Sequence, residues 1–60
     1  MAEFEIFKDD AGEFRWRLRA TGNNEPIADS GEGYTTKANC QDGIDLVKAQ
    51  APAATVQDLT

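Results

Sequence analysis

Two segments near the start of the chain alternate between apolar and polar residues with a period of two, which is typical of strands with one buried face. The segments are residues 3–8 and 13–20. Their apolar side carries Phe4, Ile6, Phe14, Trp16, Leu18 and Ala20. Their other side carries Glu3, Glu5, Phe7, Glu13, Arg15, Arg17 and Arg19. The pattern predicts two strands that turn one face toward a core.

The turn between these strands sets their register. Asp10, Ala11 and Gly12 fit a three-residue hairpin loop in which Gly12 adopts the left-handed conformation. The loop pairs Asp9 with Glu13. The pairs that follow are Ile6 with Trp16, Phe4 with Leu18, Phe7 with Arg15, Glu5 with Arg17 and Glu3 with Arg19. Apolar residues meet apolar ones and opposite charges meet at nearly every step, so a slip of one residue would lose both agreements.

A third strand follows a second turn cluster, residues 21–25. Pro26 opens this strand, which runs through about Ser30, and Ile27 is its expected core contact. Residues 30–33 then form a flexible connection into a helix. The first three elements are therefore expected to form an antiparallel meander.

The helix is predicted to begin with Thr35 or Thr36 as its N-cap and to end just before Pro52. One apolar stripe recurs at helical spacing, formed by Cys40, Ile44, Val47 and Ala51. The solvent-facing side of the helix is formed mostly by Asn39, Gln41, Asp42, Asp45 and Lys48. Leu46 lies off the stripe, where it is available to a partner.

The length of the chain limits how it can be stabilised. Its 60 residues form a single domain, residues 1–60, with a core that rarely supplies more than about 3–5 kcal/mol. The lone Cys40 cannot form an intramolecular disulfide, and without histidine it does not make a zinc site. Association with a second subunit is the remaining source of stability. The sequence therefore predicts an α+β domain that forms a homodimer.

The net charge of −5 narrows the classes of partner. It argues against duplex nucleic acid, whose binding depends on neutralising phosphates, and against anionic membrane surfaces. An acidic surface would suit a high-salt, halophilic cytosol. The chain has no apolar run long enough to span a bilayer and no signal peptide at its start, and its free cysteine favours the reducing cytoplasm.

Several short blocks together resemble the YegP-like family. The blocks are residues 4–8, 12–18, 33–40, 43–44 and 47–48, and the resemblance runs from about residue 3 to residue 58. The most specific part is Tyr34-Thr35-Thr36-Lys37, followed by Cys40 and then by Gly43-Ile44 at helical spacing. The chain departs from the family in its longer second turn and in Pro26, which leaves the pairing of the third strand open.

The resemblance implies a β-β-β-α-β unit, in which a short C-terminal strand follows the helix. It also implies that two units form one continuous sheet and exchange their C-terminal strands, either within a tandem chain or between the subunits of a dimer. The exchanged segment would be Thr55, Val56, Gln57 and Asp58, which is otherwise either frayed or a short added strand. The family is one of unknown function, so the resemblance brings no catalytic residues.

A candidate ligand patch is formed by Phe7, Arg15, Arg17 and Arg19, on the polar side of the hairpin. Arginines and an aromatic ring on an open sheet can hold single-stranded nucleic acid. The alternative is a solvated face in which the arginines pair with the neighbouring glutamates.

A weaker candidate is an anion site at Thr35, Thr36 and Lys37, where glycines precede a helix N-terminus. The order of residues does not match a phosphate-binding loop, and a plain capped helix explains the same pattern. Cys40 is interpreted as a core residue and Gly43 as a point of close packing. The Asp9-Asp10 pair is interpreted as a turn former rather than a cation site.

No catalytic, metal or cofactor site is predicted, because no pair of carboxylates, lysines or tyrosines has a spacing that fits a mechanism. The leading hypothesis is a non-enzymatic homodimeric interaction module. The alternative is a protein that binds single-stranded nucleic acid through Phe7 and the three arginines.

Overall fold

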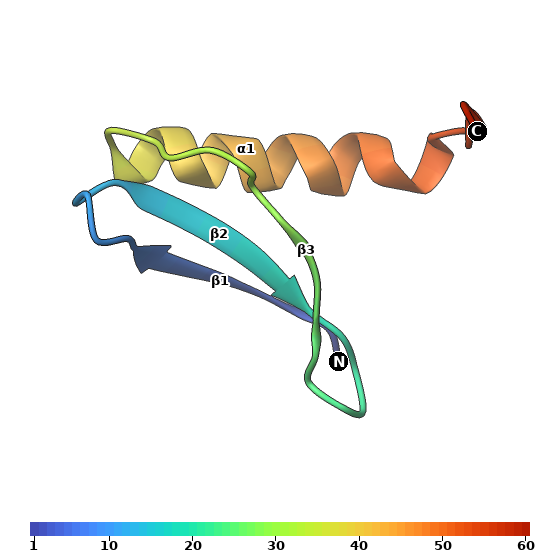
Figure 1. Cartoon of the computed structure of the whole chain (residues 1–60), viewed down its shortest axis with the longest axis horizontal. Coiled ribbons are helices and arrows are strands. Elements are labelled where there is room, and N and C mark those ends of the chain that lie inside the picture. The colour runs from blue at the N-terminus through green and yellow to red at the C-terminus, as the bar shows by residue number, and fades with distance from the viewer.

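Three strands and one helix make up the chain in the computed structural model, which describes residues 1–60. The strands are β1 (Glu3–Lys8), β2 (Phe14–Arg19) and β3 (Pro26–Asp29), and they form one antiparallel sheet in the order β1-β2-β3. The helix α1 (Lys37–Gln50) covers one face of this sheet and continues into a short 3₁₀ helix, η1 (Ala51–Ala53) (Figure 1). The predicted α+β class and meander are confirmed.

The predicted register of the first hairpin is confirmed at all five residue pairs. Gly12 has a φ of +82°, and the backbone N–H of Asp9 donates to the carbonyl of Glu13 at 2.9 Å. The Asp9 carboxylate also accepts from the N–H groups of Ala11 and Glu13. The loop therefore holds the register through both its backbone and its first side chain.

The third strand differs from the prediction in which face Ile27 occupies. Ala28 pairs with Leu18 and shares its helix-facing side, so the neighbouring Ile27 turns to the uncovered face and is 61% exposed. A bulge between Leu18 and Arg19 then lets Pro26 pair with Arg19. Ile27 as a core contact was wrong, because the register after the second turn places Ala28, not Ile27, opposite Leu18.

The helix begins as predicted, since the Thr36 hydroxyl accepts from the N–H of Asn39 at 3.1 Å. Its end also follows the prediction, with α1 stopping at Gln50 and Pro52 lying in the 3₁₀ turn that follows. The turn closes with the N–H of Ala54 donating to the carbonyl of Ala51 at 3.1 Å. Ala51 is exposed rather than part of the core, because the apolar stripe outruns the sheet.

The core lies between α1 and the hairpin and is small. Its only buried side chains are Trp16, Cys40 and Ile44. The partly buried side chains around them are Phe4, Ile6, Phe14, Tyr34 and Val47. Phe4 meets Trp16 edge to face, with ring centroids 5.5 Å apart. This confirms the predicted layer beneath the helix, but the layer is enclosed on one side only.

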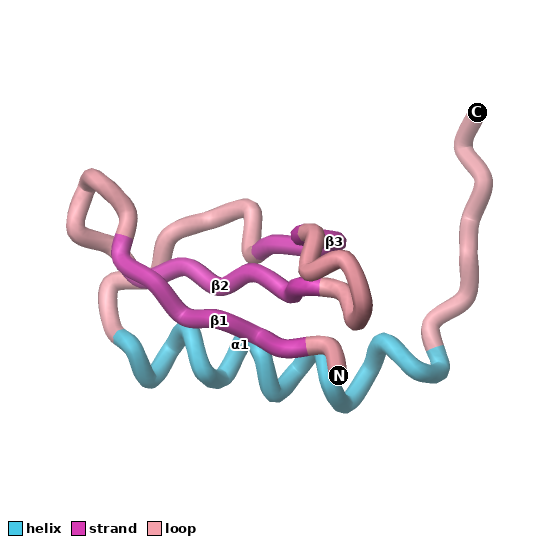
Figure 2. The backbone as a smooth tube through the Cα atoms, turned by 90° about the horizontal axis from the view of Figure 1, so that it is seen from below, coloured by secondary structure: helices cyan, strands magenta, loops and turns pink.

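Residues 54–60 form no strand within the chain. They leave η1 and run away from α1 without meeting the sheet (Figure 2). Every residue of this segment is exposed. The predicted C-terminal strand would therefore need a surface outside this chain.

Candidate functional site

The face of the sheet that α1 leaves uncovered brings together the predicted ligand patch of Phe7, Arg15, Arg17 and Arg19. Alternation along β1 and β2 places all four side chains on this face. The Arg17 guanidinium lies 4.6 Å from the centre of the Phe7 ring, a distance that permits a cation–π contact. The structure therefore brings the four residues together on one face, and ligand binding there stays a prediction.

Each arginine of the patch is paired with a carboxylate. Arg17 Nε donates to Glu5 Oε1 at 2.7 Å, and Arg19 Nε donates to the same oxygen at 2.8 Å. Arg15 Nε donates to Asp9 Oδ2 at 2.6 Å. The Arg17–Glu5 pair is as predicted, whereas Arg19 and Arg15 reach carboxylates diagonal to them across the strands.

These pairs change how the carboxylates titrate. The hydrogen bonds from Arg17 and then Arg19 lower the pKa of Glu5 from its usual value. The hydrogen bond from Arg15, followed by that from the Glu13 backbone, lowers the pKa of Asp9. The uncovered face is thus a layer of ion pairs, and its arginines are already neutralised within the chain.

The candidate anion site is assembled at the start of α1, where Thr35, Thr36 and Lys37 are all exposed. The Thr36 hydroxyl serves as the N-cap. No buried polar atom is left without a hydrogen-bond partner beside these three residues. The one such atom in the chain is the indole nitrogen of Trp16, which lies in the core. Anion binding there stays a prediction.

The other side chains that could take part in chemistry are either buried or held in an ion pair. Cys40 is fully buried, and burial raises the pKa of its thiol, which disfavours the nucleophilic thiolate. Asp9 is held by Arg15, as expected of a turn residue. No three acidic, cysteine or histidine side chains gather at a point that could hold a metal ion. No helix is both long and apolar enough to cross a membrane.

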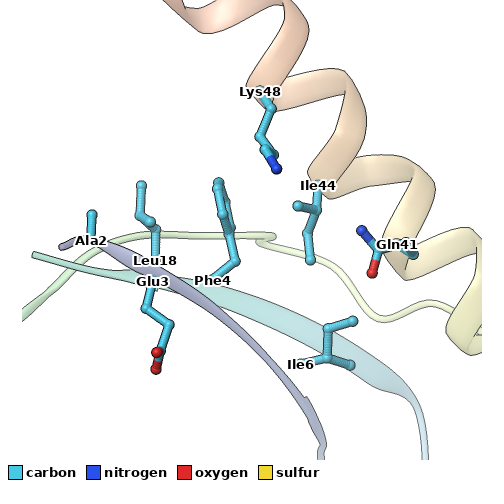
Figure 3. Close-up of a pocket in the computed structure, with 8 residues that line it drawn as sticks. All are labelled: Ala2, Glu3, Phe4, Ile6, Leu18, Gln41, Ile44 and Lys48. Carbon is cyan, nitrogen blue, oxygen red and sulfur yellow. The ribbon is translucent and has the colours of Figure 1, made fainter.

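The largest hollow of the molecule is a groove between β1 and α1, which the sequence did not predict (Figure 3). It has a volume of about 590 Å³. Its walls are formed by Ala2, Glu3, Phe4, Ile6, Leu18, Gln41, Ile44 and Lys48. Gln41 and Lys48 are exposed, as expected of the solvent-facing side of the helix, and they also border the groove beside Ile44. Their spacing of three and four residues around Ile44 was the signal that could have identified them as groove residues.

The groove opens because the sheet diverges from the helix. The two layers are close near the start of α1 and separate toward the N-terminal end of β1 (Figure 1). Nothing within the chain fills the wedge between them, and no strand lies beside the outer edge of β1. Apolar side chains and an unpaired strand edge therefore border the same space.

The residues proposed from the sequence for a dimer interface are Thr55, Val56, Gln57 and Asp58. They belong to the segment after η1, which runs away from α1 and the sheet in the isolated chain (Figure 2). Val56 is 96% exposed and Leu59 is 83% exposed. Leu46, which was expected to be available to a partner, is also exposed and borders a shallower hollow with Val47, Gln50, Ala51 and Ala54. The chain thus exposes apolar side chains at both the helix end and the tail.

Comparison with known proteins gives the chain its family. Residues 9–58 match DUF1508, described as a domain of unknown function. A UPF0339 protein of Neisseria meningitidis serogroup B is 54% identical over 93% of this chain and 96% of its own length. The solution structure of a protein from Haloferax volcanii has a TM-score of 0.87 at 47% identity, covering 95% of this chain and 93% of that one.

One relative is much longer than this chain. A UPF0339 protein of Stutzerimonas stutzeri is 49% identical over 82% of this chain, and the aligned part makes up 42% of that relative. Family match, identity and fold agree across nearly the whole sequence. The chain therefore belongs to the DUF1508 family, the UPF0339 or YegP-like proteins that its sequence blocks resemble.

Proposed function

We propose that this chain is a non-enzymatic interaction module that works as a homodimer, in which the two subunits exchange their Thr55–Asp58 segments as strands of one continuous sheet. The observation that carries this proposal is the exposure of Val56 and Leu59 in a chain that buries only three of its 60 residues. Large apolar side chains on an extended tail are typical of a segment that is ordered by a partner.

The size of the core supports association. A 60-residue domain with three buried side chains has little hydrophobic stabilisation in reserve. Further burial of apolar surface would contribute about 25 cal/mol per Å². A second subunit that covers the groove would bury Phe4 and Leu18 more completely, which supplies the stability that the isolated chain lacks.

The open edge of the sheet supports the same assembly. β1 presents six residues of strand with no neighbour on its outer side. Unpaired strand edges readily accept another extended segment, and a fourth strand added there would lie beneath α1. The length of the Stutzerimonas stutzeri relative, more than twice the aligned segment, leaves room for two such units in one chain.

The chemistry of the side chains supports a role without catalysis. The sequence has no histidine, the Cys40 thiol is enclosed, and the Glu5 and Asp9 carboxylates are held by arginines. A free thiol also supports the cytoplasm as the place where the protein works.

Single-stranded nucleic-acid binding is not adopted as a second function. The patch of Phe7, Arg15, Arg17 and Arg19 exists, but binding a phosphate backbone would require breaking the ion pairs to Glu5 and Asp9. No observation on the molecule favours that exchange.

Size-exclusion chromatography with light scattering tests the dimer. We expect twice the chain mass at micromolar concentration, and a chain ending at Ala53 should lose both the dimer and thermal stability. A chain lacking only Thr60 is the matched control, because it keeps Val56 and Leu59. A stable folded monomer at micromolar concentration would contradict the proposal, as would an unchanged melting curve after removal of the tail.

A further inference from the structure

We draw no further inference here: the strongest candidate, the shallow apolar hollow beside Leu46 and Val47 at the end of α1, lies outside the groove that the proposed homodimer would cover, and nothing in the structure shows what covers it.

Discussion

Gly43 lies directly against the hydroxyl group of Tyr34, so that a Cβ at this helix position would sit 2.7 Å from the Tyr34 hydroxyl oxygen. The same Cβ would be 3.4 Å from Nε1 of Trp16. The missing side chain lets the tyrosine ring pack close to the helix. The Tyr34 backbone is fixed by two hydrogen bonds to Phe14, both 2.8 Å long, which limits how far the ring can withdraw.

This contact predicts the effect of Gly43→Ala. Alanine favours a helix by about 1 kcal/mol over glycine, but overpacking typically costs about 1–3 kcal/mol. We expect a net loss of about 1 kcal/mol in the free energy of unfolding, measured by urea denaturation at constant protein concentration. In the Tyr34→Phe background, where the clashing oxygen is absent, the same change should be neutral or stabilising. Equal effects in both backgrounds would show that the hydroxyl contact is unimportant.

The ion pairs of the uncovered face predict an acid limit to stability. Because the pKa of Glu5 is lower in the folded chain than its ordinary value of about 4.3, the unfolded state binds more protons as the pH falls. The stabilisation is complete above the unfolded pKa and is lost as the pH drops through the lower folded pKa. Glu5→Gln should flatten this acid-side decline in melting temperature.

Glu3→Gln is the control for that experiment, because Glu3 lies on the same strand and forms no salt bridge. Its acid-side decline should match that of the wild type. If Glu3→Gln and Glu5→Gln behave alike between about pH 5 and pH 2, the shared hydrogen bonds of Glu5 do not govern acid stability.

The enclosure of Cys40 predicts slow thiol chemistry. Burial keeps the thiol neutral and out of reach of reagents, so labelling by a thiol-reactive probe should proceed only through opening of the fold. The labelling rate should rise with urea in parallel with unfolding. Cys40→Ser should lower the free energy of unfolding by about 1–3 kcal/mol, because a hydroxyl would be buried there. Rapid stoichiometric labelling of the native protein would contradict the buried position.

The neutralised arginines predict weak or absent binding to single strands. A fluorescence anisotropy titration with a labelled oligonucleotide at low salt should show no saturable binding by the wild type. Glu5→Gln releases Arg17 and Arg19 from their carboxylate and should increase any residual binding. Salt-dependent binding by the wild type that disappears in Arg17→Ala would restore the nucleic-acid hypothesis.

The hairpin could be derived from sequence because its determinants are local. The loop at Asp10–Gly12 fixes which residues oppose each other, and the alternation of Phe4, Ile6, Trp16 and Leu18 specifies the same register independently. Thr36 and Pro52 mark the helix in the same local way. These features depend on neighbours along the chain, which a single sequence contains.

Strand alternation, a local pattern, also predicted which residues share the candidate patch. It did not predict every carboxylate that pairs with the arginines of that patch. Strand alternation placed Phe7 with the three arginines and the register placed Glu5 opposite Arg17, whereas the pairing of Arg19 with Glu5 and of Arg15 with Asp9 depended on side-chain reach across the sheet. The error at Ile27 and the unpredicted groove have a related cause. The pairing of Ala28 with Leu18 and the divergence of α1 from β1 (Figure 1) are relations between elements, so no local pattern reveals them.

By itself, the sequence determined the order of the elements, the hairpin register, the ends of the helix and the identity of the family, because short-range backbone and side-chain preferences carry this information. Only the tertiary structure decided that the helix lifts away from β1 and leaves a groove, and that the tail points away from it. Those outcomes follow from how whole elements pack and from which apolar surfaces a 60-residue chain is too small to cover.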